Sequence, residues 1–346
     1  MNKITNEESK LICSINAVSM KRYARTILLS GLLLCSFGVT AEIVSIETFI
    51  DDMVARHNFN KFDLIDLLDQ AKIKKSILKV MSRPRGKKPS PWYKYRRIFL
   101  NAKRINGGVK FWQRNAKALK RAEATYGVPA EMIVAIIGVE TLYGKIKGNF
   151  RVLDALTTLA FNYPRRADFF RQELEHYLLL TREEGLDPLA QKGSYAGAMG
   201  IGQFMPSSFR RFAVDFDGDG RRNIWTNNVD AIGSVANYFR SHKWQPGQPV
   251  IKPTQVRPDA VEGLLALEFK PQYTLRRLTR GGLLYHGDEP NSTKAMFIDL
   301  ETEIGTTYWV GFQNYYVITR YNRSKRYAMA VYQLAQEIAN RYGQTR

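Results

Sequence analysis

Hydrophobic residues recur at helical spacing through the first two thirds of the chain. Between residues 43 and 82 many apolar positions stand three and four apart, as on one face of a helix. A segment rich in Pro, Gly and Lys, residues 83–91, interrupts this pattern and predicts a basic loop. The pattern predicts further helices over residues 93–126, 130–143, 152–160, 165–184, 205–213, 229–241 and 327–341.

Short β-type runs replace the helical pattern after Pro246. Such runs, separated by Pro, Gly, Asp and Asn, are typical of short strands joined by turns. They lie at residues 249–251, 273–275, 295–298 and 306–310. The sequence therefore predicts an α+β protein that is mainly α, with a small antiparallel sheet inserted into a helical molecule.

The first forty residues carry the features of an export signal. A short basic stretch, residues 20–25, precedes an almost entirely apolar run, residues 26–39, and a small-residue sequence that ends at Ala41. This order is that of a secretory signal peptide, and the apolar run is shorter than the ~20 residues that span a membrane. The alternative is a buried N-terminal helix. The sequence favours cleavage near Ala41 and location in the periplasm, with Met1 or Met20 as the start.

The two cysteines, Cys13 and Cys35, both precede the expected cleavage site. The mature chain is therefore expected to have no disulfide and no thiol chemistry. Cys35 is also a candidate for lipid attachment, but the leucines at 32–34 stand where a lipid-attachment signal has small residues. Lipidation is disfavoured for this reason, and membrane contact through the signal segment or a lipid anchor stays open.

Basic residues dominate the charge of the chain. Lys and Arg exceed Asp and Glu by 52 to 32, which gives a formal net charge of +20. Such a charge favours polyanionic partners: nucleic acid, an anionic membrane surface or a cell wall that carries carboxylates. Aromatic residues interleaved with Lys and Arg between residues 72 and 125 would suit nucleic acid. The export signal argues against that partner, so no nucleic-acid partner is expected.

One carboxylate stands on an apolar helix. Glu140 follows Ile136 and Ile137 by four and three residues, so the three side chains share a face. Removal of water from a carboxylate raises its pKa, and an acid that is protonated near neutral pH can protonate a leaving oxygen. Glu140 is therefore a candidate general acid. Periodicity alone favours the alternative, a glutamate at a helix end that points into water.

Six segments in order carry a more specific pattern than the helix around Glu140. They are residues 138–144 (GVETLYG), 153–159 (LDALTTL), 161–166 (FNYPRR), 193–208 (GSYAGAMGIGQFMPSS), 230–239 (DAIGSVANYF) and 318–324 (ITRYNRS). In identity and spacing they resemble the membrane-bound lytic murein transglycosylase B family, over most of residues 43–344. The resemblance implies a lysozyme-like helical core with one catalytic glutamate and no second catalytic carboxylate.

The resemblance also implies a reaction for Glu140. This residue would protonate the β-1,4 oxygen between N-acetylmuramic acid and N-acetylglucosamine in peptidoglycan. The 6-hydroxyl of the muramyl residue would attack its own C1, give its proton to Glu140 and leave a 1,6-anhydro end. Ordinary glycosidases need a second carboxylate, whereas an intramolecular nucleophile supplies a high effective concentration. A hydrolytic muramidase and an inactive wall-binding scaffold are the alternatives that the sequence leaves open.

Substrate-binding residues also follow from the resemblance. Ser194 and Gln203 correspond to polar groups near the acid that hydrogen-bond the sugar. A second group, expected to stack on saccharide or to line the cleft and its far wall, consists of Phe204, Tyr238, Tyr327, Tyr321 and Asn322. The alternative for the aromatic residues is packing in the core, and for Ser194 and Gln203 it is hydrogen bonding within a loop.

Residues 215–230 resemble the first part of an EF-hand calcium loop. Asp at positions one, three and five supplies oxygens to a cation, and Gly at position six allows a sharp turn. Position twelve is Thr226 rather than a bidentate Glu, so the closing ligand stays open, with Asp230 as the candidate. The expected ligands of a structural Ca²⁺, with Na⁺ as the alternative, are Asp215, Asp217, Asp219, the backbone carbonyl of Arg221, and Asp230. No cofactor is expected for catalysis.

These patterns divide the chain into an export segment, a helical domain, a core and a sheet. The predicted boundaries are 1–41 for the N-terminal extension and signal peptide, 42–126 for a basic helical domain completed by 327–344, 127–245 for the lysozyme-like catalytic core with the ion loop 215–230, 246–310 for the small β domain, and 311–326 for the return to the core at the cleft wall. A monomer that acts on peptidoglycan glycan strands is expected.

Overall fold

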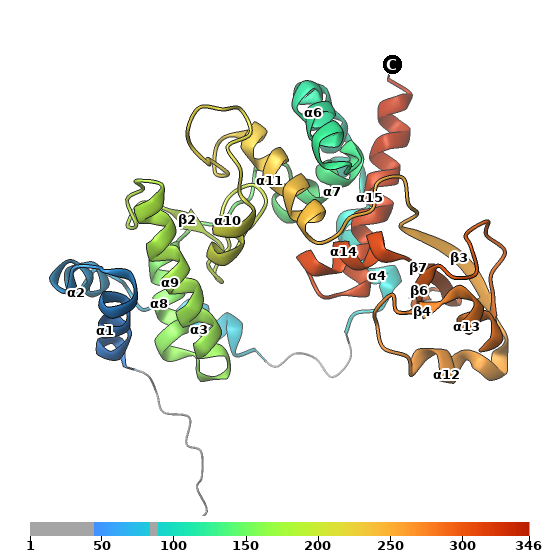
Figure 1. The fold of residues 1–346 in the computed structure, drawn as a ribbon, viewed down its shortest axis with the longest axis horizontal. Coiled ribbons are helices and arrows are strands. Elements are labelled where there is room, and N and C mark those ends of the chain that lie inside the picture. Colours follow the sequence, from blue (N-terminus) through green and yellow to red (C-terminus); the bar gives the residue numbers. More distant parts are fainter. Residues whose placement is uncertain (1–44, 84–88, 346) are drawn as a thin grey trace, which may run out of the picture. The chain divides into compact units, whose positions relative to one another are not determined.

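The computed structural model describes residues 45–83 and 89–345, which belong to one compact unit, Ile43–Arg346 (Figure 1). The predicted export segment, with Cys13, Cys35 and Ala41, lies outside the described residues, as does most of the predicted basic loop. The described chain is mainly helical with a small antiparallel sheet, so the predicted α+β class is confirmed.

Six short helices occupy the two regions where long helical stretches are predicted. Their bounds are α1 (Ile46–His57), α2 (Lys61–Asp69), α3 (Lys75–Met81), α4 (Trp92–Phe99), α5 (Ala102–Arg114) and α6 (Ala116–Tyr126). Asparagines make several of the breaks. Asn58 takes a left-handed conformation, φ 55°, at the end of α1. The side chains of Asn60 and Asn101 accept hydrogen bonds from backbone N–H groups at the starts of α2 and α5.

The helix that carries Glu140, α7 (Ala130–Thr141), lies in the buried centre of the core. Every residue from 132 to 139 is buried, because α5, α6, α11 (Asn228–Ser241) and α15 (Lys325–Gly343) pack around it. The helix is thus apolar on all sides and not only on the face shared by Ile136, Ile137 and Glu140. Burial of each large aliphatic side chain contributes roughly 1.5–3 kcal/mol, so α7 is a fixed base for the residues at its C-terminal end.

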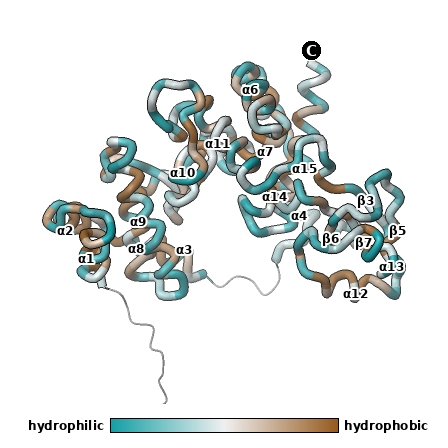
Figure 2. Tube along the Cα trace, viewed as in Figure 1, coloured by the Kyte–Doolittle hydropathy of each residue, from teal (hydrophilic) through white to brown (hydrophobic). Residues whose placement is uncertain are grey.

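The remaining core helices pack on one another and on the helices around α7. They are α8 (Val152–Asn162), the 3₁₀ turn η1 (Pro164–Arg166), α9 (Ala167–Glu183), α10 (Pro206–Phe212) and α14 (Gln313–Tyr321), of which α14 is not predicted from the sequence. Helices α8 and α9 pack against each other, and α10 packs on α9 and α11. Hydrophobic stretches run along α7, α8 and α9 (Figure 2). A short ladder of β1 (Phe150–Arg151) and β2 (Lys192–Gly193) joins the start of α8 to the loop that follows β2.

The sheet has five antiparallel strands in the order β4-β6-β7-β3-β5. Their bounds are β3 (Ile251–Val256), β4 (Tyr273–Thr274), β5 (Leu283–Leu284), β6 (Lys294–Thr302) and β7 (Gly305–Gly311). Four strands overlap the predicted runs, β3 only at Ile251, whereas β5 has two residues and is too short to show alternation. The sheet and two short helices, α12 (Val261–Leu265) and α13 (Leu275–Arg280), share their own hydrophobic cluster, which includes Leu275, Leu283 and Phe297.

The final helix, α15, connects distant parts of the sequence. It packs on α7, α5, α4 and α14, and its first turn brings Tyr327 to the C-terminal end of α7. Within the described segments, no single helix is long and apolar enough to cross a membrane; α6 and α7 together pass that test by length and composition alone, with a bend of 114° between them. The domain boundaries stay a prediction.

Candidate active site

Glu140 occupies the last turn of α7, where the buried helix reaches the surface. The residue is partly exposed, in contrast to the buried residues that precede it. The hydroxyl of Tyr327 donates a hydrogen bond of 2.5 Å to Oε1 of Glu140. Burial raises the pKa of Glu140 to about 7, against the opposing effect of the Tyr327 hydrogen bond. At neutral pH the carboxyl group therefore holds its proton in a large fraction of molecules, as a general acid requires.

Four tyrosines form the polar surroundings of this carboxyl group. Burial raises the pKa of Tyr95, Tyr238, Tyr321 and Tyr327, and the negative charge of Glu140 raises each of them further. Among the described residues, no cation and no second carboxylate shifts the pKa of Glu140. The arrangement suits a carboxyl group that exchanges a proton with a ligand rather than one held in an ion pair.

Tyr95, on α4, is a member of this group that the sequence did not reveal. Its ring lies 5.2 Å from the nearest ring of the same helix, that of Phe99, and the guanidinium of Arg326 lies 5.2 Å above it. The one signal in the sequence is an aromatic and basic run, residues 92–97, which predicts only part of a basic helix. Its relation to Glu140 depends on the packing of α4 against α15, a long-range contact.

A sharp reversal of the chain fixes the end of α7. Leu142, Tyr143 and Gly144 have φ of 51°, 61° and 81°, a left-handed conformation that is unfavourable for the first two. Two hydrogen bonds hold the reversal: Thr141 Oγ1 donates to the carbonyl of Ile201 at 2.8 Å, and the Tyr143 hydroxyl donates to the carbonyl of Arg104 at 2.7 Å. These contacts leave Glu140 little freedom to move with the helix end.

The Tyr143 ring lies in a slot lined by glycines from α5 and α7. A Cβ atom added at Gly138 would stand 2.5 Å from the Tyr143 hydroxyl oxygen, and one added at Gly107 would stand 2.8 Å from the ring. Gly108 meets the same hydroxyl at 2.8 Å. The slot therefore accepts the tyrosine only because these three positions lack side chains.

The loop after β2 carries two predicted substrate-binding residues. Gln203 has a left-handed φ of 53°, and its Nε2 donates to the carbonyls of Lys147 and Gly200 at 3.1 and 2.9 Å. Ser194 Oγ accepts hydrogen bonds from the backbone N–H groups of Ala196 and Ala198. Both side chains thus shape the loop, which the Thr141–Ile201 hydrogen bond attaches to the end of α7. Their predicted bonds to sugar stay predictions.

Predicted aromatic residues of the cleft pack against one another beside Glu140. The Phe204 ring centre lies 5.7 Å from that of Tyr238 and 6.0 Å from that of Tyr321, and the two tyrosine rings are 4.7 Å apart. The Tyr238 hydroxyl donates to the carbonyl of Arg320 at 2.6 Å, and that of Tyr321 to Gly202 at 2.5 Å. The rings therefore form one packed aromatic cluster; their place in a cleft wall and their stacking on saccharide stay predictions.

The remaining predicted positions differ in accessibility. Phe204, Tyr238 and Tyr327 are 3%, 7% and 2% exposed, so little of each ring faces solvent, whereas Asn322 is exposed at the end of α14. The structure thus brings Glu140, Tyr238, Tyr321 and Tyr327 together, with Phe204 packed behind them. Among the residues that the structure describes, no hydrogen bond joins Glu140 to Ser194, Gln203 or Asn322.

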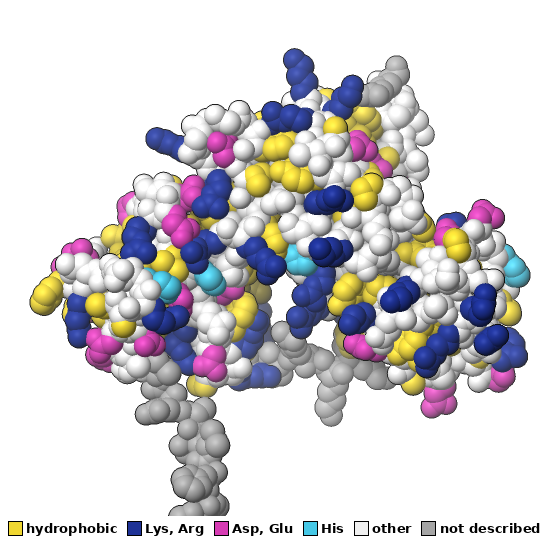
Figure 3. Space-filling view, viewed as in Figure 1, with side chains coloured by type: hydrophobic (Ala, Val, Ile, Leu, Met, Phe, Trp, Pro, Cys, Tyr) yellow, Lys and Arg dark blue, Asp and Glu magenta, His cyan; other side chains and the backbone are white. Residues whose placement is uncertain are grey.

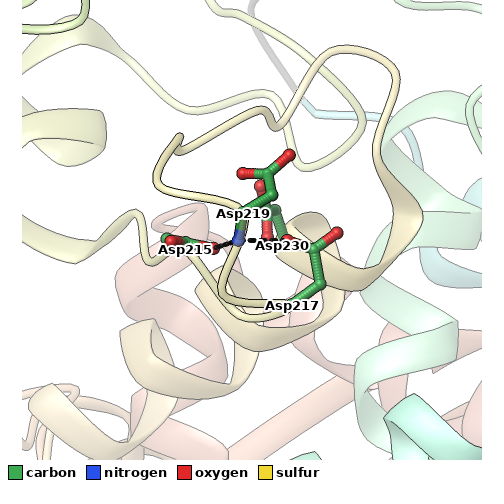
Figure 4. A group of neighbouring side chains, drawn as sticks. All are labelled: Asp215, Asp217, Asp219 and Asp230. Atoms are coloured by element: carbon green, nitrogen blue, oxygen red, sulfur yellow. Dashed lines mark hydrogen bonds between the residues drawn. The ribbon is translucent and has the colours of Figure 1, made fainter.

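A cluster of four aspartates forms a candidate ion site where the loop after α10 meets the first turn of α11, which carries Asp230 (Figure 4). One carboxylate oxygen from each of Asp215, Asp217, Asp219 and Asp230 lies within 4.8 Å of the others. Asp215 accepts hydrogen bonds from the N–H groups of residues 218, 219 and 220, which wrap the loop around it. Four carboxylates this close repel one another unless a cation lies between them, so the donor set fits a hard cation with oxygen ligands.

Asp230 is the buried member of this cluster. It accepts backbone hydrogen bonds from Phe216 at 2.8 Å and Asn223 at 2.7 Å, and burial raises its pKa. Its place beside the other three supports Asp230 rather than Thr226 as the closing group. The Arg221 N–H donates to Asp219, and the predicted role of the Arg221 carbonyl stays a prediction.

Comparison with known proteins places the chain in a family. It matches the family model described as Transglycosylase SLT domain over residues 44–336. It is 46% identical over 302 residues to the membrane-bound lytic murein transglycosylase B of Escherichia coli (strain K12), covering 85% of this chain and 82% of that protein. The soluble lytic transglycosylase SltB1 of Pseudomonas aeruginosa is 49% identical, with a TM-score of 0.82 over 86% of this chain and 99% of that one.

Two further structures carry bound ligands. The Escherichia coli lytic transglycosylase Slt35 in complex with calcium is 46% identical, with a TM-score of 0.76 over 86% of this chain and 93% of that one. SltB3 of Pseudomonas aeruginosa in complex with NAG-NAM-pentapeptide is 28% identical, with a TM-score of 0.74 over 85% of this chain and 78% of that one.

These matches confirm the resemblance predicted from the six sequence segments. The structural neighbours also confirm the predicted fold, a lysozyme-like, mainly helical protein with a small antiparallel sheet. The chain therefore belongs to the transglycosylase SLT domain family, and its homologues are lytic murein transglycosylases, enzymes that act on peptidoglycan.

Proposed function

We propose that this chain cleaves the β-1,4 bond between N-acetylmuramic acid and N-acetylglucosamine in peptidoglycan and leaves 1,6-anhydromuramyl ends. The observation that carries the proposal is the state of Glu140, a carboxyl group with a pKa of about 7 that accepts a hydrogen bond from Tyr327. By the sequence resemblance, its position in the GVETLYG segment corresponds to the catalytic glutamate of the family. Homologues with this enzymatic class support the reaction.

Glu140 acts first as the acid and then as the base. Its proton goes to the glycosidic oxygen as the bond from that oxygen to C1 breaks. The 6-hydroxyl oxygen of the same muramyl residue forms a new bond to C1, and its proton returns to Glu140. Because the nucleophile is part of the substrate, no second carboxylate is needed to activate water. The surroundings of Glu140, which consist of tyrosine hydroxyls, are consistent with this one-carboxyl mechanism.

The glycan would lie against the aromatic cluster of Phe204, Tyr238 and Tyr321, of which Tyr321 is the more exposed member. Further contacts to the glycan would come from Ser194, Gln203, Asn322 and Tyr327. The Gln203 side chain is held by its hydrogen bonds to the carbonyls of Lys147 and Gly200, and a hydrogen bond from Thr141 attaches its loop to the end of α7. The strained backbone of Gln203 supports a functional role, since such conformations persist where the surrounding structure holds them.

Mass spectrometry of peptidoglycan fragments tests the proposal directly. Wild-type protein should release fragments with anhydro ends, and Glu140→Gln, which keeps the size of the side chain, should release none above background. Reducing ends in place of anhydro ends would assign the chain to the hydrolytic muramidases. Full activity of Glu140→Gln would exclude Glu140 as the acid. A folded wild-type chain that releases no fragments at all would favour a wall-binding scaffold.

We also propose that the aspartate cluster binds Ca²⁺ as a structural ion, with Na⁺ as the competing cation. The complex of the relative Slt35 with calcium supports this, together with the four converging carboxylates. Asp215, Asp217, Asp219 and Asp230, with the Arg221 carbonyl, would hold the ion. The cation would neutralise the repulsion among these groups and stiffen the loop that leads into α11.

The proposed location is the periplasm, where the substrate lies. The export features of residues 1–41 and the membrane-bound name of the Escherichia coli relative support it. The protein would act there as a monomer on glycan strands, with the domain boundaries predicted from the sequence.

A further inference from the structure

Hydrogen bonds that lead inward to α7 distinguish parts of the molecule that look alike at the surface. Lys and Arg side chains are spread across the face seen in the space-filling view (Figure 3), so charge gives no part of that face a special role. The inward hydrogen bonds do single out one turn. It consists of residues 223–226 and directly follows the aspartate loop.

The turn is held at its first residue. Asp230, the buried member of the aspartate cluster, accepts a hydrogen bond of 2.7 Å from the N–H group of Asn223. The Asn223 side chain then shapes the turn. Its Oδ1 accepts from the N–H groups of Trp225 and Thr226 at 3.2 and 3.1 Å, and its Nδ2 donates to Thr226 Oγ1 at 2.7 Å. An asparagine that accepts from the backbone just ahead of it fixes the path of the chain.

The next residue, Ile224, contacts the loop after β2. Its carbonyl accepts a hydrogen bond of 2.8 Å from the N–H group of Ile201, and both isoleucines are buried. The two backbones approach closely because Gly200 has a φ of 70° and no side chain. A Cβ atom at Gly200 would stand 2.5 Å from the Ile224 carbonyl oxygen. The position of the turn therefore determines the position of Ile201.

Ile201 is joined in its turn to the residue after the acid. Its carbonyl accepts the 2.8 Å hydrogen bond from Thr141 Oγ1, and Thr141 is the buried last residue of α7, directly after Glu140. Three hydrogen bonds thus lead from the aspartate cluster through the turn to the residue beside the acid.

A second connection runs from the same turn to Gln203. The Lys147 ammonium donates to the carbonyl of Trp225 at 2.6 Å, and the carbonyl of Lys147 accepts from Gln203 Nε2 at 3.1 Å. Gln203 is the residue with a left-handed backbone that is predicted to bind sugar. A change in the turn is therefore expected to reach the candidate site by two routes.

We propose that Asn223 is a positioning residue for Glu140, which fixes the turn after the aspartate loop and thereby holds the end of α7 in place. Its side chain acts through the backbone of the turn and takes no part in proton transfer. The inference rests on the proposed function of Glu140, and it adds a residue from outside the six segments of the sequence resemblance.

Loss of this support should admit water to the end of α7. Burial is the cause that raises the pKa of Glu140 to about 7, so a looser helix end should lower that pKa toward the ordinary glutamate value. The four tyrosines around the acid have raised pKa values and stay protonated in this range. A titration near neutral pH at this site therefore reports on Glu140.

The test compares wild type with Asn223→Ala and Asn223→Asp, all in excess CaCl₂. Asn223→Ala should lower kcat for anhydro product by about 10-fold, because a displacement of about 1 Å at a catalytic group can cost up to about 100-fold. Asn223→Asp keeps the oxygen that accepts from Trp225 and Thr226, so its kcat should stay within about 2-fold of wild type.

Asn60→Ala is the matched control. Asn60 Oδ1 also accepts from two backbone N–H groups, those of Phe62 and Asp63 at 2.8 and 3.2 Å, but at the start of α2, which packs on α1. Asn60→Ala should lose a melting temperature similar to that lost by Asn223→Ala and keep the wild-type kcat. An equal loss of kcat in this control would assign the effect to stability and overturn the inference.

Carbon NMR of labelled glutamate carboxyl groups follows Glu140 without substrate, with Glu140→Gln to assign its signal. The pKa of Glu140 should fall in Asn223→Ala and stay in place in Asn223→Asp and Asn60→Ala. A fall supports the positioning role even if wild type releases no anhydro product, so the inference and the proposed function can fail separately. The rise in melting temperature with calcium should be the same in wild type and Asn223→Ala; loss of that rise would assign the effect to the ion and overturn the role of Asn223.

A wild-type kcat together with an unmoved Glu140 titration in Asn223→Ala would overturn the inference, as would an equal loss in Asn223→Asp. If Asn223→Ala does not fold, Asn223→Ser takes its place. The serine hydroxyl accepts the same bonds more weakly, so a smaller loss of kcat and a smaller fall in the pKa of Glu140 are expected. No change in either quantity would again overturn the inference.

Discussion

The hydroxyl of Tyr327 donates a 2.5 Å hydrogen bond to Oε1 of Glu140, although 187 positions separate the two residues in sequence. A hydrogen bond of this kind favours the charged carboxylate, while burial favours the neutral acid. The two effects oppose each other at one atom. The pKa of about 7 is the result of burial outweighing the tyrosine.

Replacement of Tyr327 by Phe should move the alkaline limb of the activity profile to higher pH. Without the hydrogen bond that stabilises the carboxylate, the pKa of Glu140 rises above about 7, so the acid keeps its proton further into the alkaline range. The maximal rate should fall several-fold, because the carboxyl group loses a contact that positions it. The pH dependence of kcat/KM for the two proteins is the measurement. A limb that stays in place or moves to lower pH would contradict the role assigned to Tyr327.

Glu140→Gln should stabilise the protein in alkaline solution. The folded-state pKa of about 7 exceeds the ordinary glutamate pKa of 4.5, so the folded chain binds more protons than the unfolded one between those two pH values. Stability is therefore lost as the pH rises from about 4.5 to about 7, and the full penalty, at most ~3 kcal/mol, persists above that range.

Thermal melts of both proteins at pH 4 and pH 8 check this expectation. Gln carries no charge, so the variant should melt above wild type at pH 8, and the difference should shrink at pH 4. An equal difference in melting temperature between the two proteins at both pH values would instead indicate a packing effect.

Gly138→Ala should destabilise the fold and lower activity together. The new methyl group would stand 2.5 Å from the Tyr143 hydroxyl oxygen, so the ring would have to leave its slot. Overpacking of this kind costs about 1–3 kcal/mol. Gly263→Ala on α12 is the matched control, since no atom lies within 4 Å of its added Cβ. Gly263→Ala should melt at or above the wild-type temperature. If its melting temperature falls as far as that of Gly138→Ala, crowding of the Tyr143 ring does not explain the loss of stability.

Calcium should raise the melting temperature of wild type but not of Asp217→Asn. A bound ion stabilises by about 2.7 kcal/mol at a concentration one hundred times its dissociation constant. Asp217 is an exposed member of the cluster, so its replacement should cost little folding stability of its own. Melts in CaCl₂, in NaCl and in chelator distinguish the two cations. An identical calcium response in both proteins would place the ion elsewhere.

The sequence predicted which helices and strands are present better than it predicted the residues at which they begin and end. Helical spacing located α7 to α11 and α15, because hydrophobic contacts of an amphipathic or buried helix repeat locally. The two long helical stretches divide into six helices at points such as Asn58 and Asn101, where side-chain capping competes with helix continuation. Neither α14 nor β5 was predicted: β5 pairs two residues with β3 and has no pattern of its own.

Site residues close to Glu140 in the sequence could be predicted more easily than those far from it. The apolar neighbours of Glu140, three and four positions away, made it a candidate, but its spacing alone favoured a glutamate that points into water, and the resemblance to a family singled it out. Tyr327, Tyr238 and Tyr321 required the resemblance to a family, since nothing in their spacing relates them to α7. Tyr95 was missed altogether, because its approach to Glu140 arises from the packing of α4 on α15. The predicted sugar contacts of Ser194 and Asn322 stay predictions.

The acid of α7 lies in the first half of the chain, and the hydroxyl of α15 lies close to its end. A polypeptide that appears N-terminus first presents Glu140 long before Tyr327, and until α15 arrives one side of an otherwise apolar helix has no cover. Assembly of the reactive pair is thus a late event that waits for the last helix. A fragment that stops short of residue 325 would possess the carboxyl group yet be inert, and prone to aggregate through the uncovered face.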